Sequence, residues 1–138
     1  MIRKILLAYD GSDPSRKAFD FAAEMAQRHG AELFVLTVAE VPEFPEDVET
    51  EAVVEHSRAY HQKLLDGLAE QASGLGVAVH LQLVVGHPAR QIIAEAERCQ
   101  ADLLVLGHRG RGLLDRWRLG SVTHRVISYA DCPVTVVR

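Results

Sequence analysis

The segment KILLAYDGSDPSRKAFDFAAEMAQRHGAELFVLTV, residues 4–38, places a helical pattern between two short apolar runs. The runs at 4–9 and 32–38 are nearly continuous in apolar residues, as in strands that are covered on both faces. Between them, residues 15–30 repeat apolar side chains at helical spacing and end at Gly30, a common helix stop. The segment therefore predicts a strand–helix–strand unit with parallel strands.

The same alternation continues through the rest of the chain. Apolar runs predict three further strands, at 77–85, 102–107 and 133–138. Amphipathic patterns predict three further helices, at 50–73, 88–99 and 121–130. No internal repeat is present. We therefore expect a single α/β domain over residues 1–138, with an open sheet of five mainly parallel strands and helices on both faces.

Composition excludes several classes of protein. The 138 residues are 48% hydrophobic and 25% charged, which is typical of a globular domain. A net charge of −4 disfavours a general nucleic-acid or membrane-binding surface. No apolar stretch approaches the roughly 18 residues of a membrane span, and the first apolar run is shorter than a secretory signal requires. Cys99 and Cys132 form no CxxC pair, so we expect both to be small buried residues. With neither a secretory signal nor a membrane span indicated, a reduced cytoplasmic setting is the default expectation.

One segment interrupts the regular pattern. Residues 39–51, AEVPEFPEDVETE, contain six carboxylates and two prolines and no basic residue. Prolines after a strand predict a surface loop. The alternative is a mobile lid or a partner surface, because the segment leaves the carboxyl end of a strand.

A second unusual segment, GHRGRGLLDRWRLGSVTH at 107–124, contains four of the ten glycines and four arginines before its helical part. The four arginines are Arg109, Arg111, Arg116 and Arg118. Asp115 is the one carboxylate in residues 107–120, so this stretch is strongly positive. Glycine allows close approach of the backbone to a ligand, and the helix that begins at Ser121 offers unpaired N–H groups. Together these features predict an anion-binding site. The alternative is an ordinary strand end, turn and helix cap.

The spacing of these glycines indicates which phosphate-binding motif the chain contains. The chain has no GxxxxGK[ST] motif and no GxGxxG after the first strand, so neither common phosphate-binding fingerprint applies. The chain instead contains Gly107-x2-Gly110-x9-Gly120-Ser121. This spacing resembles the G-x2-G-x9-G-[ST] nucleotide motif of the universal stress protein family. The blocks KILLAYDGSDPSRKAFDFA, GHPARQIIAEAE, ADLLVLGHRGRG and LGSVTHRVISYADCPVTVVR resemble that family too, so the resemblance covers essentially the whole chain.

The resemblance implies a Rossmann-like sheet in the order 3-2-1-4-5, with a nucleotide between the carboxyl ends of strands 1 and 4. It implies ATP, with Mg²⁺ or Mn²⁺, as the ligand; ADP, AMP and a cyclic nucleotide stay open as alternatives. Asp10 would face adenine or ribose, away from phosphates that its charge would repel. The alternative for Asp10 is a turn-forming role. The implied site consists of Ala8, Asp10 and Val38 at the nucleoside end, Leu106 and Gly107 at the ribose, and Gly110, Gly120, Ser121, Val122 and Thr123 at the phosphates.

The sequence offers little for catalysis. It contains no GxSxG or HExxH motif, and the seven histidines are scattered. His108 lies inside the glycine-rich segment and is read as either solvent-facing or ligand-facing. By resemblance we expect a nucleotide-responsive regulator of the stress response, with at most slow ATP hydrolysis.

A second function remains open: a dimeric stress-response interaction protein that does not use nucleotide, with an unknown protein partner. The last apolar run would lie at a sheet edge, which invites pairing with another chain. We therefore expect a homodimer through residues 133–138, antiparallel by two-fold symmetry. Nucleic-acid binding through the arginines is a minor third interpretation, and it would depend steeply on salt.

Overall fold

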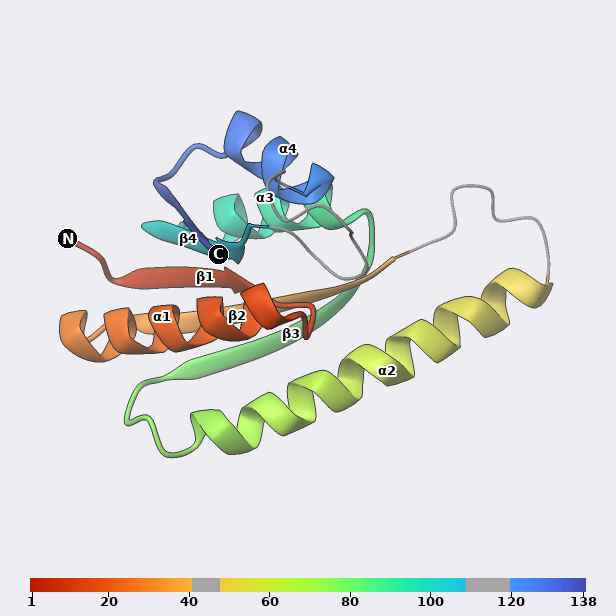
Figure 1. The fold of residues 1–138 in the computed structure, drawn as a ribbon, viewed down its shortest axis with the longest axis horizontal. Coiled ribbons are helices and arrows are strands. Elements are labelled where there is room, and N and C mark those ends of the chain that lie inside the picture. Colours follow the sequence, from red (N-terminus) through yellow and green to blue (C-terminus); the bar gives the residue numbers. More distant parts are fainter. Residues whose placement is uncertain (41–47, 109–119) are drawn as a thin grey trace.

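The computed structural model describes residues 1–40, 48–108 and 120–138, and strands and helices alternate along them (Figure 1). The strands are β1 (Lys4–Ala8), β2 (Glu32–Glu40), β3 (Val79–Gly86), β4 (Leu103–Gly107) and β5 (Val134–Val137). The helices are α1 (Asp13–His29), α2 (Val48–Ala72), α3 (Pro88–Arg98) and α4 (Ser121–Tyr129). Every strand and helix expected from the sequence is present, with ends shifted by one or a few residues.

The five strands form one sheet in the order β3-β2-β1-β4-β5. All neighbouring strands pair in parallel, and Leu6 of β1 lies opposite Phe34 of β2 on one side and Leu104 of β4 on the other. The predicted fold class and strand order are confirmed. The order reverses at β1, so the carboxyl ends of β1 and β4 form the edge where such sheets bind ligands.

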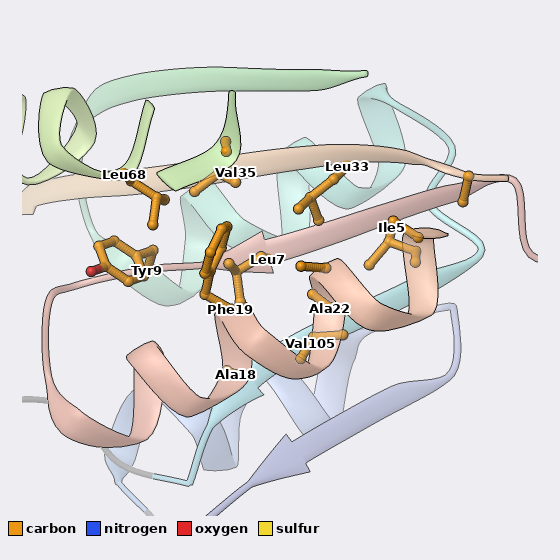
Figure 2. Packing of buried hydrophobic residues seen from close by; sticks show 14 of the residues in the cluster. Ile5, Leu7, Tyr9, Ala18, Phe19, Ala22, Leu33, Val35, Leu68 and Val105 are labelled. Carbon is orange, nitrogen blue, oxygen red and sulfur yellow. The ribbon is translucent and has the colours of Figure 1, made fainter. Parts of the chain in front are cut away.

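Helices cover both faces of the sheet, which explains the continuous apolar runs of the strands. Ile5 and Leu7 pack beneath α1 and α2, whereas Leu6 packs beneath α3 and α4. Figure 2 shows Leu7 and Val35 of the sheet against Phe19 of α1. Because successive side chains of a strand point to opposite faces, both sets of positions must be apolar.

Local signals set the ends of α1. The Ser12 hydroxyl accepts a hydrogen bond from the Ser15 N–H, and Pro14 occupies the first turn, so the helix begins before the predicted residue 15. Gly30 has a φ of +64° and ends the helix, as its position in the sequence predicted.

The predicted loop at 39–51 is too long at both ends. Ala39 is buried, and β2 continues to Glu40 because Ala39 and Glu40 still pair with Val85 and Gly86 of β3. At the other end α2 already begins at Val48. Residues 41–47 lie outside the described part of the chain, so the role suggested for them stays a prediction.

Cys99 is buried, as expected, whereas Cys132 is only half-buried because it lies in the turn before β5. Burial raises the pKa of both thiols above the ordinary value. Among the described residues, no helix has the length and apolar content needed to cross a membrane.

Candidate functional site

A cavity of about 520 Å³ lies at the carboxyl ends of β1, β2 and β4. Its volume is within the range of small-molecule sites. Eight of the residues that the sequence proposed for the site line it together: Ala8, Asp10, Val38, Leu106, Gly107, Ser121, Val122 and Thr123. The cavity thus lies where the strand order reverses, at the predicted edge of the sheet.

One proposed site residue, Gly120, is not among the described residues that line the cavity. Gly120 is buried just before α4, and its N–H donates a hydrogen bond to the His108 carbonyl at 2.9 Å. Gly110 lies outside the described residues, as do the four arginines of the glycine-rich segment. The bond between Gly120 and His108 holds these two residues together beside the cavity.

The first turn of α4 forms one wall of the cavity. Gly120 is its N-cap and supplies no side-chain hydrogen bond, in contrast to Ser12 at the start of α1. The Thr123 hydroxyl donates to the Gly107 carbonyl at 2.8 Å, which fixes this turn to the end of β4. A helix N-terminus without a capping side chain is a site for an anion, through its N–H groups and its partial positive charge.

Gly107 has a packing role that its position in the motif did not reveal. A Cβ on Gly107 would lie 2.7 Å from the Cβ of Pro14 and 3.0 Å from the Pro14 carbonyl carbon. The end of β4 therefore packs directly on the first turn of α1. The close approach at Gly107 is thus to the protein's own backbone, although the residue also lines the cavity.

Asp10 combines both of the roles considered for it. Its Oδ1 accepts a hydrogen bond from the Ser12 N–H at 2.9 Å, so the side chain does shape the turn. The residue nevertheless lines the cavity and is half-buried. A carboxylate has further lone pairs, so the bond to Ser12 leaves acceptor capacity for a ligand.

The structure adds cavity residues that sequence reasoning missed. Ser57 and His61 enter from α2, and Glu40 enters from the end of β2; the others are Tyr9, Ser12, Ser15, Leu36, Pro88 and Ile92. Ser57 and His61 are four residues apart and share a helix face with Leu64, Leu65 and Leu68. That shared face is the signal that could have placed His61 toward the interior.

Ser57 and His61 are not arranged as a nucleophile and its base. His61 Nδ1 lies 2.7 Å from the Ser57 carbonyl oxygen and 3.4 Å from the Ser57 hydroxyl. Because a carbonyl oxygen only accepts, the shorter contact assigns the proton to Nδ1, which then cannot take a proton from the hydroxyl. The His61 imidazole therefore does not activate the Ser57 hydroxyl as a nucleophile in this arrangement.

Comparison with known proteins agrees with this reading of the fold. The model of the universal stress protein family matches residues 1–138. A universal stress protein of Methanocaldococcus jannaschii is 36% identical over 141 residues, covering 100% of this chain and 83% of that protein. The structure of universal stress protein UspA from Lactobacillus plantarum has a TM-score of 0.89 at 28% identity, covering 99% of this chain and 98% of that one. A universal stress protein in complex with cAMP has a TM-score of 0.68 at 25% identity, covering 99% and 97%.

Proposed function

The chain belongs to the universal stress protein family, and from this premise we propose that it binds an adenine nucleotide between the carboxyl ends of β1 and β4. In this proposal it is a stress-response regulator whose state depends on that nucleotide. No catalytic residue is assigned.

The observation that carries the proposal is that the two ends of one cavity carry groups of opposite charge preference. Asp10 and Glu40 supply carboxylates at the carboxyl ends of β1 and β2, and the first turn of α4, whose N-cap Gly120 makes no side-chain hydrogen bond, lies at the end of β4. Carboxylates repel phosphates but accept hydrogen bonds from amines and hydroxyls, whereas a helix N-terminus attracts phosphates. A molecule with a donor-rich neutral part and an anionic part fits both ends, as a nucleotide does.

The proposed contacts follow the same division. Ala8, Asp10 and Val38 would hold the nucleoside, and Leu106 and Gly107 would lie at the ribose. Ser121, Val122 and Thr123, together with Gly110 and Gly120 of the glycine motif, would hold the phosphates. The cAMP complex of a family neighbour supports a purine nucleotide as the ligand class, and ATP is the member of that class proposed here.

A divalent ion, Mg²⁺ or Mn²⁺, completes the proposal. No group of three or more His, Cys, Asp or Glu side chains able to hold a metal occurs among residues 1–40, 48–108 and 120–138. In this proposal the ion binds chiefly phosphate oxygens and water, with few protein ligands, as Mg²⁺ commonly does in nucleotide sites.

Isothermal titration with ATP, ADP, AMP, cAMP and GTP, each with and without Mg²⁺, tests the proposal. We expect adenine nucleotides to bind more tightly than GTP, and Mg²⁺ to strengthen ATP binding more than AMP binding. If none of these ligands binds to protein shown to be free of bound nucleotide, the alternative of a partner-binding protein without nucleotide replaces this one.

We also propose a homodimer through the C-terminal run 133–138. Among the strands that the structure describes, β5 pairs with β4 alone and lies at the edge of the sheet. Its outer side therefore carries backbone groups able to pair with the same strand of a second copy, antiparallel about a two-fold axis.

A further inference from the structure

The wall of the cavity formed by α2 is fixed in place by tight packing. A Cβ on Gly11 would lie 2.9 Å from both Cδ atoms of Leu64, so this leucine packs directly on the backbone next to Asp10. Leu65 and Leu68 are 3% and 2% exposed and anchor the helix on the sheet. His61 lies one turn before Leu64 on the same face of α2, so the packing holds it beside the Asp10 turn.

The imidazole of His61 is itself oriented. Its Nδ1 lies 2.7 Å from the Ser57 carbonyl oxygen, and the Tyr60 ring packs against it edge-on with a centroid distance of 5.2 Å. The carbonyl contact assigns the proton of the neutral ring to Nδ1. Nε2 therefore carries a lone pair and is a hydrogen-bond acceptor.

His61 lies on the side of the cavity away from the proposed phosphates. α2 packs on one face of the sheet with α1, and α4 packs on the opposite face with α3 (Figure 1). His61 thus shares its side with the Asp10 turn, while the first turn of α4 closes the other. In the proposed binding mode, the part of the ligand nearest His61 is the nucleoside.

From this geometry we propose that His61 is a specificity-determining residue of the nucleotide site, a role that rests on the proposed function. Its Nε2 accepts a hydrogen bond from a donor on the nucleoside, either the exocyclic amine of adenine or a ribose hydroxyl. A bond to the amine would add to the acceptor character of Asp10 and disfavour a base that presents a carbonyl oxygen there, whereas a bond to a hydroxyl would select ribose over deoxyribose.

Titrations of wild type, His61→Phe and His61→Gln with a panel of triphosphates test this role. The panel is ATP, purine riboside triphosphate, which lacks the amine, and 2′-deoxy-ATP and 3′-deoxy-ATP, which each lack one hydroxyl. His61→Phe keeps the ring shape and removes the acceptor, and we expect ATP affinity to fall on the order of 10-fold. His61→Gln restores an acceptor oxygen and should recover part of that loss.

The analogues identify the donor. The analogue that lacks the bonded group should bind wild type about as weakly as ATP binds His61→Phe. His61→Phe should bind that analogue with the same affinity as it binds ATP. His56→Phe, an exposed histidine of the same helix outside the cavity lining, should bind ATP as wild type does. Unfolding midpoints without ligand show that each variant is folded.

Two results would overturn the role of His61. In one, His61→Phe binds ATP as tightly as wild type. In the other, it loses the same factor for every analogue, which indicates packing rather than a hydrogen bond. Failure of wild type to bind any nucleotide is a separate outcome; it removes the proposed function together with this inference.

Discussion

Single residues at the carboxyl edge of the sheet fix how the helices approach it. Gly11 has a φ of +81°, which favours glycine, and its bare Cα admits Leu64 of α2. Gly107 admits Pro14 of α1 in the same way. Both glycines bring a helix close to the cavity, so their first role is to shape the site rather than to contact a ligand.

Gly107→Ala should destabilise the protein by about 1–3 kcal/mol, because the new Cβ would overlap the Pro14 side chain and backbone. The matched control is Gly67→Ala in α2, where an added Cβ meets nothing within 4 Å. That change should instead stabilise the helix by about 0.5–1 kcal/mol. Urea unfolding measures both, and equal effects of the two substitutions would contradict the packing assigned to Gly107.

Asp102 ties the N-terminal segment to the turn before β4. Its Oδ2 accepts hydrogen bonds from the N–H groups of Arg3 at 2.8 Å and Lys4 at 3.0 Å. These backbone donors, Arg3 first, hold the pKa of Asp102 below its ordinary value. A lowered folded-state pKa means that the ionised carboxylate stabilises the fold above the unfolded-state pKa of about 3.9, and that this contribution is lost as pH falls below it.

Asp102→Asn should therefore lower the free energy of unfolding at pH 7 by about 1 kcal/mol, a modest figure because the side chain is partly exposed. The difference from wild type should shrink as the pH is lowered through 4 toward about 3. Asp20→Asn, on the exposed face of α1, is the control. A difference that stays constant from pH 7 to 3 would show that the charge of Asp102 is not involved.

Among the helices and strands, the start of α4 is the feature on which the proposed phosphate binding depends. Ser121 is exposed at its first position, and the helix lacks a capping side chain. A negative charge placed there satisfies the helix terminus in the same way as a bound phosphate. Because N-cap Gly120 makes no side-chain hydrogen bond to this terminus, an acceptor or a negative charge introduced there should stabilise the helix.

Ser121→Asp should raise the stability of the ligand-free protein by about 0.3–1 kcal/mol and weaken ATP binding by about 10-fold or more. Ser121→Asn carries no charge at nearly the same size, so it should leave ATP affinity within about 3-fold of wild type. Thermal unfolding and isothermal titration measure the two effects. Equal ATP affinity of the Asp and Asn variants would show that the start of α4 does not bind the phosphates.

The elements differ in how far the sequence could predict them. Continuous apolar runs such as KILLAY and DLLVLG predicted strands buried on both faces, and the resemblance supplied their order. The end of β2 could not be predicted from the local sequence, because Ala39 belongs to the strand through its pairing with β3, more than 40 residues away. His61 was missed for a related reason: which face of α2 meets the cavity depends on the packing of Leu64 on Gly11.

At the scale of the whole molecule, β5 forms the edge of the sheet at which we propose that a second copy pairs. The carbonyls of Pro133 and Val137 accept hydrogen bonds from Leu104 and His108, so alternate residues of β5 face β4. The backbone groups of Val134 and Val136 between them point outward from the sheet. This outer row is where the proposed dimer pairs.

Val136→Pro should weaken the dimer by at least about 10-fold while the monomer stays folded. Proline removes an outward N–H and is tolerated on an edge strand where that group makes no bond within the sheet. Sedimentation equilibrium measures the association, with thermal unfolding as the check on folding. A folded variant that dimerises as wild type does would show that the interface lies elsewhere.

The central claim is that one cavity at the β1–β4 edge holds an adenine nucleotide, and its most direct test is the thermal unfolding midpoint of nucleotide-free protein with and without ATP–Mg²⁺. At about 100 times the dissociation constant, a bound ligand adds roughly 2.7 kcal/mol, which corresponds to a rise of about 10 °C for a domain of this size. The proposed binding predicts such a rise with ATP, a much smaller one with GTP, and a rise about half as large in Ser121→Asp if its ATP binding is about 10-fold weaker. An unchanged midpoint with every nucleotide, or an equal rise in Ser121→Asp, would contradict it.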